Sequence, residues 1–261
     1  MQKPVNIFWF RRDLRLNDNT GLYAALQTDH PVQAVFIFDR NILDKLENKN
    51  DQRVAFIHAA LTEIQEELLK LGGTLHVYYD TAENAWTKIV SDYNIEKVFT
   101  NNDYEPYAAE RDKRVEGFLN QGKIDFQTYK DQVIFEKNEV TKDDGKPYTV
   151  FTPYSKKWKA TLAQYPFTSV STKKYLSNFY KQPPRKIPSL SAIGFTNTER
   201  SFPSSQLNEE IVKKYSSQRN YPGIRGTTKM GIHLRFGTIS IRELAKKAMA
   251  LNETFLNELS R

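Results

Sequence analysis

The chain has 261 residues, of which 39% are hydrophobic and 26% charged, so it can bury a full core and is not disordered throughout. It contains no cysteine, which excludes disulfides, thiolate metal sites and a cysteine nucleophile and fits a reducing compartment. Lysine and arginine total 38 against 31 aspartate and glutamate, and the net charge of +7 favours polyanionic partners such as nucleic acid.

The start of the chain, MQKPVNIFWFRRDLRL, has too short an apolar run for a signal peptide, and no run in the sequence reaches membrane-spanning length. We therefore expect a cytoplasmic protein with no membrane contact. The four histidines are scattered without the spacing of metal ligands, so no metal site is predicted.

Short apolar runs and amphipathic stretches alternate through the first half of the chain, as strands and helices do in α/β folds. The runs at 5–10 and 32–38 are apolar on consecutive residues, which is typical of parallel strands covered on both faces. At 51–73 apolar residues recur every three or four positions along one helix face, and Gly72 favours a stop. We predict an α/β domain over 1–130 with a doubly wound, five-stranded parallel sheet and helices on both faces.

The composition changes in the second half of the chain. Residues 166–205 are rich in Pro, Ser and Lys with little periodicity, and we predict an interdomain linker over 131–205. Helical patterns return afterwards, and the last of them, ETFLNELSR, runs to the final residue with no stop signal. We expect 206–261 to be the beginning of a helical domain that is truncated in this chain.

The loop after the first strand is strongly basic. Ligands of open parallel sheets bind beyond the carboxyl ends of the strands, and Arg11, Arg12 and Arg15 lie there. Asn17 or Asp18 can cap the helix that follows, so fixed positive charge is predicted next to free backbone donors. Two alternatives stay open, because these arginines can contact a ligand or can form ion pairs with neighbouring acids.

The segment NNDYEPYAAERDKRV follows the fourth predicted strand and should lie at the same edge of the sheet. Pro106 suits a first helical turn, with Asp103 and Glu105 at the positive start of that helix. These acids can cap the helix as plain structure. Beside Tyr104 and Tyr107 they can instead form hydrogen bonds with a planar polar ring.

The segment RNYPGIRGTTKMGIHLRFGTIS, residues 219–240, is a further candidate site. Gly223 and Gly226 permit close backbone approach, and Thr227 and Thr228 place hydroxyls just before a helical pattern, which suits a diphosphate. The segment is not a P-loop, because Gly-Lys-Thr/Ser at the required spacing is absent. A simple helix cap is the structural alternative.

Three segments, in this order, resemble the DNA photolyase and cryptochrome family: WFRRDLRLNDNTGL, GKPYTVFTPYSKKW and GTTKMGIHLRFGTIS. The resemblance covers essentially the whole chain. It implies an N-terminal α/β domain that carries an antenna pigment, followed by a helical domain that binds FAD. In this family the reduced FAD, excited through the antenna, donates an electron to a pyrimidine dimer flipped out of DNA and so splits it.

The resemblance also implies roles for single positions. The residues that match the family's FAD-binding segment are Tyr215, Thr227, Thr228, Lys229, Met230 and Gly231. Arg219 matches an arginine near the DNA lesion, which implies damaged DNA as the partner of the full-length protein. Gly231 and Ile232 stand where the family often has Ser-Pro, so one side-chain hydroxyl is missing. No catalytic residue is expected within this chain.

The antenna pigment follows from the same resemblance. Folate-type members have an Asn-Glu pair where this chain has Tyr107 and Ala108, which disfavours folate. Members with a deazaflavin-type pigment resemble this chain in their pocket, and a deazaflavin or FMN antenna is therefore expected. The antenna residues implied are Arg11, Arg53, Asp103, Glu105 and Tyr107.

Length is the main departure from the family. Its members continue after ETFLNEL with a long helical region that holds most of the FAD contacts, whereas this sequence ends two residues later. We expect the N-terminal portion of a light-dependent deoxyribodipyrimidine photo-lyase, inactive on its own. The alternative is a cryptochrome-like blue-light receptor or a stand-alone pigment-binding module.

Overall fold

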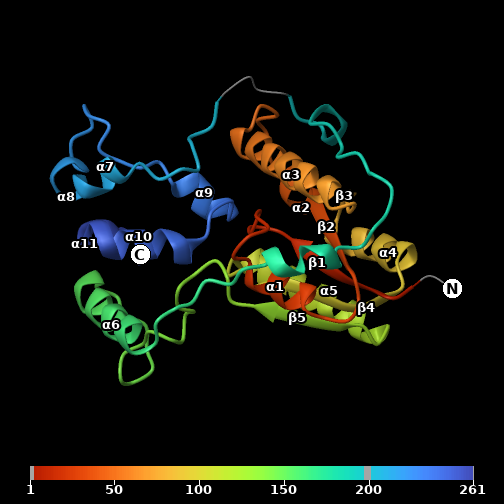
Figure 1. The fold of residues 1–261 in the computed structure, drawn as a ribbon, viewed down its shortest axis with the longest axis horizontal. Helices are drawn as coiled ribbons and strands as arrows, with labels where there is room; N and C mark the ends of the chain where they lie inside the picture. Colours follow the sequence, from red (N-terminus) through yellow and green to blue (C-terminus); the bar gives the residue numbers. More distant parts are fainter. Residues whose placement is uncertain (1–2, 197–200, 261) are drawn as a thin grey trace. The chain divides into compact units, whose positions relative to one another are not determined.

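The computed structural model describes residues 3–196 and 201–260. Two compact units form the chain, and each combines two separate stretches of sequence (Figure 1). The first unit consists of Met1–Asp131 and Val170–Phe202, and the second of Gln132–Ser169 and Pro203–Arg261.

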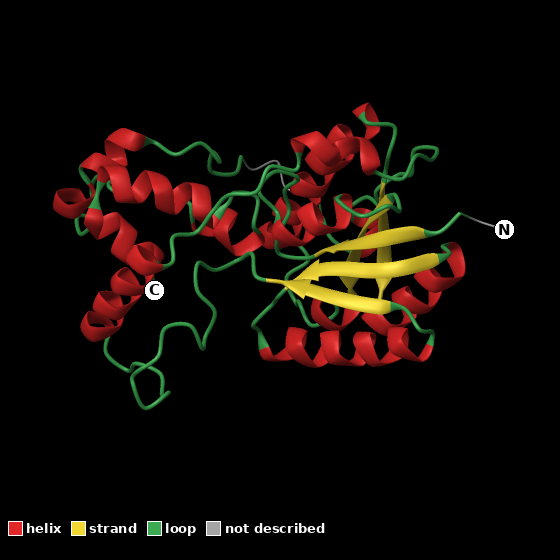
Figure 2. Cartoon of the chain, turned by 60° about the horizontal axis from the view of Figure 1, so that its bottom comes forward, coloured by secondary structure: helices red, strands yellow, loops and turns green. Residues whose placement is uncertain are grey.

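The first unit contains a five-stranded sheet in the order β3-β2-β1-β4-β5, and every pair of neighbours is parallel (Figure 2). The strands are β1 Val5–Phe10, β2 Val32–Asp39, β3 Leu75–Asp80, β4 Ile95–Asn101 and β5 Asp125–Tyr129. The predicted doubly wound parallel sheet is confirmed. β1 and β2 are buried along their whole length, as their consecutive apolar residues predict.

Helices cover both faces of this sheet. They are α1 Thr20–Leu26, α2 Arg40–Leu43, α3 Gln52–Lys70, α4 Ala82–Asp92 and α5 Pro106–Gln121. Ile7 and Trp9 of β1 pack in one cluster with Trp86 of α4 and Leu119 of α5, so these helices share a face. Successive side chains of a strand point to opposite faces, so Phe8 and its even-numbered neighbours face the other side, toward the crossovers that contain α1 and α3.

The helix ends of the first unit follow local chemistry. The helix predicted over 51–73 is confirmed as α3, and Gly72 follows it with a φ of +75°. The cap predicted at Asn17 or Asp18 is wrong, because the side chain of Asn19 accepts the hydrogen bond from Leu22 N at 3.1 Å. Asp18 has a φ of 47°, and its carboxylate accepts from Val170 N instead.

The second unit is helical. Its helices are α6 Phe151–Gln164, α7 Glu209–Lys213, α8 Tyr215–Gln218, α9 Gly231–Phe236, α10 Ile241–Leu251 and α11 Glu253–Leu259. Trp158 of α6 packs in the core of this unit with Met230, Leu244 and Phe255. Across 3–196 and 201–260, no helix is both long and apolar enough to cross a bilayer.

The residues of the region expected as an interdomain linker, 131–205, are divided between the two units. Its first part, with α6, belongs to the second unit, and residues 170–202 belong to the first. There Phe179 is buried, and Tyr180 N donates to Val32 O at 2.8 Å. Single buried aromatic residues, separated by polar residues, hold the segment in place. Such spacing has no helix or strand periodicity, so the sequence did not predict this packing.

Candidate functional site

Two arginines of the basic loop fasten the carboxyl end of β1 to distant parts of the first unit. Arg11 forms an ion pair with Asp112 of α5 and donates to the carbonyl of Asn101 at the end of β4. Arg15 Nη2 lies 2.7 Å from Asp131 Oδ2, and the Asp131 side chain is fully buried. The side chains of both ion pairs are largely shielded from solvent. Arg11 and Arg15 therefore stabilise this edge of the sheet.

Arg12 joins the same edge to the start of α5. Its Nη1 lies 3.3 Å from Asp103 Oδ1 and 3.2 Å from Glu105 Oε1. Pro106 occupies the first helical turn, as predicted, but Glu105 makes no side-chain cap bond. The two acids therefore serve as partners of Arg12. The alternative of internal ion pairs holds for all three arginines of the loop.

Asp13 is the buried centre of a polar network that the sequence did not reveal. Its carboxylate accepts from Arg11 N at 2.7 Å and from Asn101 Nδ2 at 2.6 Å. Asn101 in turn accepts from Gly21 N at 2.8 Å and donates to Asn19 Oδ1 at 2.8 Å. Burial raises the pKa of Asp13 even though these hydrogen bonds oppose the shift. The network ties the ends of β1 and β4 to the start of α1.

Trp9 packs against two guanidinium groups at this edge. The Cζ atoms of Arg11 and Arg111 lie 5.0 Å and 4.8 Å from the centroid of its ring. Both arginines share Asp112 as a carboxylate partner. The arrangement fixes two cations over one aromatic ring by cation–π attraction. Nothing in the sequence indicated the contact of Arg111 with Trp9, because a charged residue in a helix usually faces solvent.

Tyr107 bonds to the end of β2. Its hydroxyl donates to Asp39 Oδ2 at 2.6 Å, and Asp39 also caps α2. Lys45 Nζ and Arg111 Cζ both lie 5.9 Å from the centroid of the Tyr107 ring. Burial, reinforced by the hydrogen bond to Asp39, raises the pKa of Tyr107 to about 12. An aspartate that closes an apolar run, FIFD, is the signal that could have pointed to Asp39.

Arg53 stands apart from the other antenna positions. Its side chain is 58% exposed and pairs with Asp51, the cap of α3, with Nη2 2.5 Å from Oδ2. This hydrogen-bonded pair lowers the pKa of Asp51. Among the described residues Asp51 is the sole ion-pair partner of Arg53, and no hydrogen bond links Arg53 to Tyr107 or to Asp103. Arg12 thus joins Asp103 to Glu105, and Asp112 with Arg111 joins Arg11 to Tyr107. Arg53 lies on the surface.

Tyr215 and Arg219, which the resemblance implies for FAD and DNA, lie on α8 and at its end. The Tyr215 ring is edge-on to Phe255 of α11, with ring centroids 5.1 Å apart. Arg219 forms an ion pair with Glu258 of α11 and lies 5.9 Å from the Tyr215 ring centroid. A short Tyr-Arg-Glu-Phe cluster therefore holds α8 on α11.

Gly226 brings the following loop against the end of α8. A Cβ atom at this position would lie 2.5 Å from the carbonyl oxygen of Gln218, closer than real contacts allow. At Gly223 a Cβ atom would meet nothing within 4 Å. Of the two glycines predicted to permit close approach, Gly226 does so and Gly223 does not.

The loop from Thr227 to Gly231 exposes polar groups. Thr227 and Lys229 are exposed and Thr228 is half-buried, while Met230 is buried in the core of the unit. Within 3–196 and 201–260 no hydrogen bond engages either threonine hydroxyl. Lys229 has a φ of 57°, a left-handed conformation that is uncommon for a residue with a side chain. α9 begins at Gly231, where added side-chain atoms would meet nothing within 4 Å.

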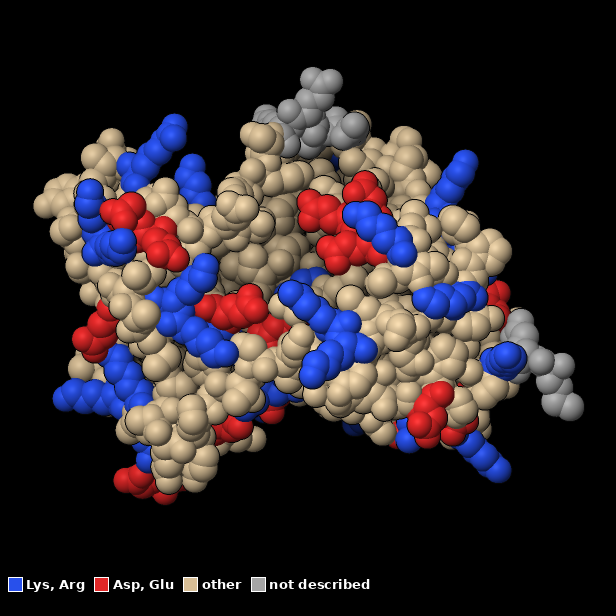
Figure 3. Space-filling model, viewed as in Figure 1, with Lys and Arg blue, Asp and Glu red and all other residues tan. Residues whose placement is uncertain are grey.

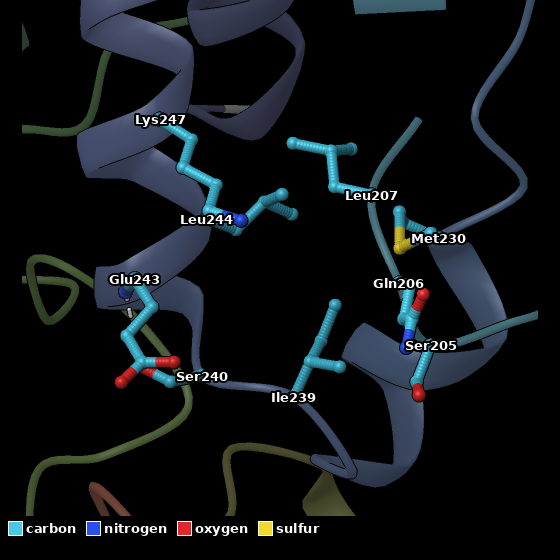
Figure 4. A pocket seen from close by; sticks show the side chains of 9 residues that line it. All are labelled: Ser205, Gln206, Leu207, Met230, Ile239, Ser240, Glu243, Leu244 and Lys247. Atoms are coloured by element: carbon cyan, nitrogen blue, oxygen red, sulfur yellow. Dashed lines mark hydrogen bonds between the residues drawn. The ribbon is translucent and has the colours of Figure 1, made fainter. Parts of the chain in front are cut away.

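Met230 also closes a pocket of about 390 Å³ in the second unit (Figure 4). Its apolar wall comes from Leu207, Met230, Ile239 and Leu244, and Glu243 and Lys247 of α10 lie at its side. No group of His, Asp and Glu side chains in the described part of the chain is arranged to hold a metal ion.

Comparisons with known proteins agree on one family. The family model for DNA photolyase matches residues 6–173. An uncharacterized 31.6 kDa protein of a Synechococcus strain is 31% identical over 93% of this chain and 88% of its own length. The deoxyribodipyrimidine photo-lyase of another Synechococcus strain is 27% identical over 96% of this chain, which spans 54% of that enzyme. The structure of a class III photolyase from Agrobacterium tumefaciens matches 99% of this chain and 56% of its own, with 22% identity and a TM-score of 0.77.

Proposed function

Because the chain belongs to the DNA photolyase family, we propose that it supplies the antenna domain and the first FAD-binding segment for light-dependent repair of pyrimidine dimers in DNA. The observation that carries the proposal is the family match over 6–173, followed by the photolyase-like segment at 219–240. The chain spans about half the length of the curated photolyases that it matches. Repair is therefore proposed for the longer protein, and this chain alone is proposed to be inactive.

The loop after Gly226 suits the diphosphate of FAD. The hydroxyls of Thr227 and Thr228 have no partner in the described chain, and the first backbone N–H groups of α9 follow them. Gly231 lacks the hydroxyl of the serine found in many relatives, but its backbone is open to close approach. FAD, when bound, supplies the light-excited electron donor. The residues of this chain, including Lys229 and Met230, hold and orient it.

The carboxyl edge of the sheet suits a flavin-like antenna, FMN or deazaflavin. Parallel sheets bind ligands at this edge, where Asp103, Glu105 and Tyr107 lie and where Arg11 pairs with Asp112. Arg53 is proposed to turn from Asp51 toward the pigment. Folate is disfavoured, because the Tyr107 hydroxyl already donates to Asp39 and Ala108 is buried and apolar.

Damaged DNA is the proposed partner of the full-length protein in the cytoplasm. The net charge of +7 favours phosphate contacts, and Arg219 is proposed to lie near the lesion. On the face drawn in Figure 3, lysine and arginine side chains are interspersed with acids. Arg219 and its surroundings are therefore the DNA contact that we propose for this chain.

The first test is an absorption and fluorescence spectrum of the purified chain, with the pigment released by denaturation and identified by mass. A stoichiometric FMN or deazaflavin is expected. A bound folate would contradict the assignment of the antenna. Blue-light splitting of dimers by the chain alone would contradict its proposed inactivity, and a full-length photolyase is the positive control.

A stand-alone pigment-binding module or a cryptochrome-like receptor is the second candidate. It is favoured by the 31.6 kDa relative, of which this chain covers 88%. Two results together would support this candidate over repair. The chain would bind pigment tightly, and a fusion of the chain to the C-terminal half of a photolyase would bind damaged and undamaged duplex DNA equally.

A further inference from the structure

A second, polar cavity lies at the amino edge of the sheet in the first unit, away from the antenna positions. It has a volume of about 130 Å³ and is surrounded by the starts of β1 and β4, the end of α4 and the returning segment 180–185. The residues that line it are Lys3, Val5, Asp92, Tyr93, Asn94, Tyr180, Gln182 and Arg185. Its size suits a small ion or a terminal group, because pockets for drug-sized ligands are larger, at about 300–1,000 Å³.

The backbone of Arg185 is fixed at this cavity. Its N–H donates to Thr74 Oγ1 at 3.0 Å, and its carbonyl accepts from Gln65 Nε2 at 2.6 Å. Gln65 and Thr74 are buried and bonded to each other, with Gln65 Nε2 2.8 Å from Thr74 Oγ1. The exposed side chain of Arg185 therefore starts from a rigid position.

The guanidinium of Arg185 is oriented by a neutral partner. Arg185 Nη1 donates to His76 Nε2 at 3.3 Å, so the ring proton lies on Nδ1, beside the hydroxyls of Tyr78 at 2.7 Å and Tyr93 at 3.0 Å. Burial and the charge of Arg185 lower the pKa of His76 to about 4, so the ring is uncharged at neutral pH. Within 3–196 and 201–260 no carboxylate forms an ion pair with Arg185. Its positive charge is oriented but not neutralised.

The cavity contains one carboxylate as well as the two cations. Asp92 Oδ2 accepts from Tyr78 OH at 2.8 Å, which leaves further lone pairs on the carboxylate. Lys3 and Arg185 together outweigh this charge. A carboxylate repels a fully ionised anion but accepts a hydrogen bond from an anion that carries a proton.

We propose that this cavity binds a hydrogen-bearing oxyanion, namely inorganic phosphate or the terminal group of a small phosphate monoester. Its charge lies against Arg185 and Lys3, and its hydroxyl donates to Asp92. Sulfate has the same shape but no proton at neutral pH, so Asp92 discriminates against it. The proposal does not depend on photochemistry or on the antenna.

The test is titration calorimetry of the complete chain with inorganic phosphate and, separately, with sulfate at matched ionic strength and neutral pH. Phosphate is expected to bind at least about tenfold more tightly than sulfate. Arg185→Gln is expected to weaken phosphate binding at least about tenfold, because an oriented charged donor is lost. Lys186→Gln is the matched control, since it removes the same charge from an exposed neighbour that does not line the cavity.

Further variants separate the roles of the two signs of charge. Asp92→Asn is expected to raise sulfate affinity toward that of phosphate. Lys3→Gln is expected to weaken both anions and serves as the second cation variant if Arg185→Gln unfolds. Titration with phenyl phosphate distinguishes the two ligands. An affinity equal to that of inorganic phosphate identifies a site for monoesters, and a much lower affinity identifies a site for the free ion. Equal binding of phosphate and sulfate, or equal affinities in Arg185→Gln and Lys186→Gln, would overturn the proposal.

Discussion

The two units of the molecule differ in how completely their polar and aromatic groups are enclosed. In the first unit the largest fully buried side chains include Trp9, Trp86 and Phe99, and the arginines at the carboxyl edge have carboxylate partners. In the second unit Trp158 and Phe255 are buried in the core as well, but the loop after Gly226 leaves Thr227 exposed and Thr228 half-buried. The contrast separates a unit whose carboxyl-edge arginines are paired with acids of the same unit from one whose loop after Gly226 leaves Thr227 and Lys229 exposed.

The largest expected effect lies in the core of the first unit. Trp86 is fully buried and meets Trp9 edge-on with ring centroids 5.4 Å apart, so Trp86→Ala should lower the free energy of unfolding by about 3–5 kcal/mol. Urea unfolding followed by far-UV circular dichroism measures the loss. Phe118→Ala, at a position of α5 that is 38% exposed, is the control and should cost clearly less than Trp86→Ala. Equal losses of stability in the two variants would contradict the role of Trp86 in the buried core.

The next effect tests the close approach in the second unit. Gly226→Ala should destabilise that unit by about 1–3 kcal/mol, because the new methyl group collides with the Gln218 carbonyl. Gly223→Ala adds the same atom in open space and should stay within about 0.5 kcal/mol of the parent chain. Thermal unfolding of the two variants side by side is the measurement. If they melt together, the loop is not fixed by Gly226.

A smaller effect concerns pH and the amino edge of the first unit. The pKa of His76 is about 4 in the folded chain against 6.5 for an ordinary histidine, so the unfolded chain binds more protons between these values. Stability present above pH 6.5 is therefore lost as the pH falls toward 4. His76→Gln should reduce this loss of stability by about 1–2 kcal/mol. The effect is smaller than the difference in pKa alone would give, because solvent screens the partly exposed ring.

Unfolding in urea across that pH window gives the slope for His76→Gln and for the parent chain. His30→Gln is the control, because in the described chain the His30 ring makes no hydrogen bond or ion pair. A slope that stays unchanged in His76→Gln would contradict the buried, uncharged state of His76.

The smallest effect on stability belongs to Arg53. Its ion pair with Asp51 is exposed, so Arg53→Gln should change the free energy of unfolding by less than about 0.5 kcal/mol. Pigment content should nevertheless fall if Arg53 is released to bind the antenna. Arg114→Gln, which breaks another exposed ion pair, with Glu83, is the control and should keep the pigment. Absorption spectra of the purified variants decide between a pigment contact and a surface ion pair.

The sequence predicted the first unit well because its signals are local. Consecutive apolar residues in β1 and β2 report strands covered on both faces, and the spacing around Leu61 reports the buried face of α3. The polar partners of the carboxyl edge were not predictable in this way. Asp112, Asp131 and Asp39 lie far along the chain from Arg11, Arg15 and Tyr107, which they bind, and aspartate is common on any surface.

The sequence predicted less of the second unit and of the segment 170–202, which packs on the first unit. Trp158 and Phe179 anchor opposite parts of a region whose polar composition suggested a linker. Short helices such as α8 and α9 have too few residues for a periodic pattern, so only the Gly-Thr-Thr motif indicated the loop between them. The conformation of Lys229 depends on that loop and has no sequence signal of its own.

The buried pair of Arg15 and Asp131 has a consequence for how this protein can change over generations. Replacement of either residue alone leaves a charge that is largely shielded from solvent without this partner, at a cost of about 3–5 kcal/mol. Two changes separated by more than a hundred positions would have to occur together. Lineages that descend from this chain should therefore inherit the two residues as a pair or lose both.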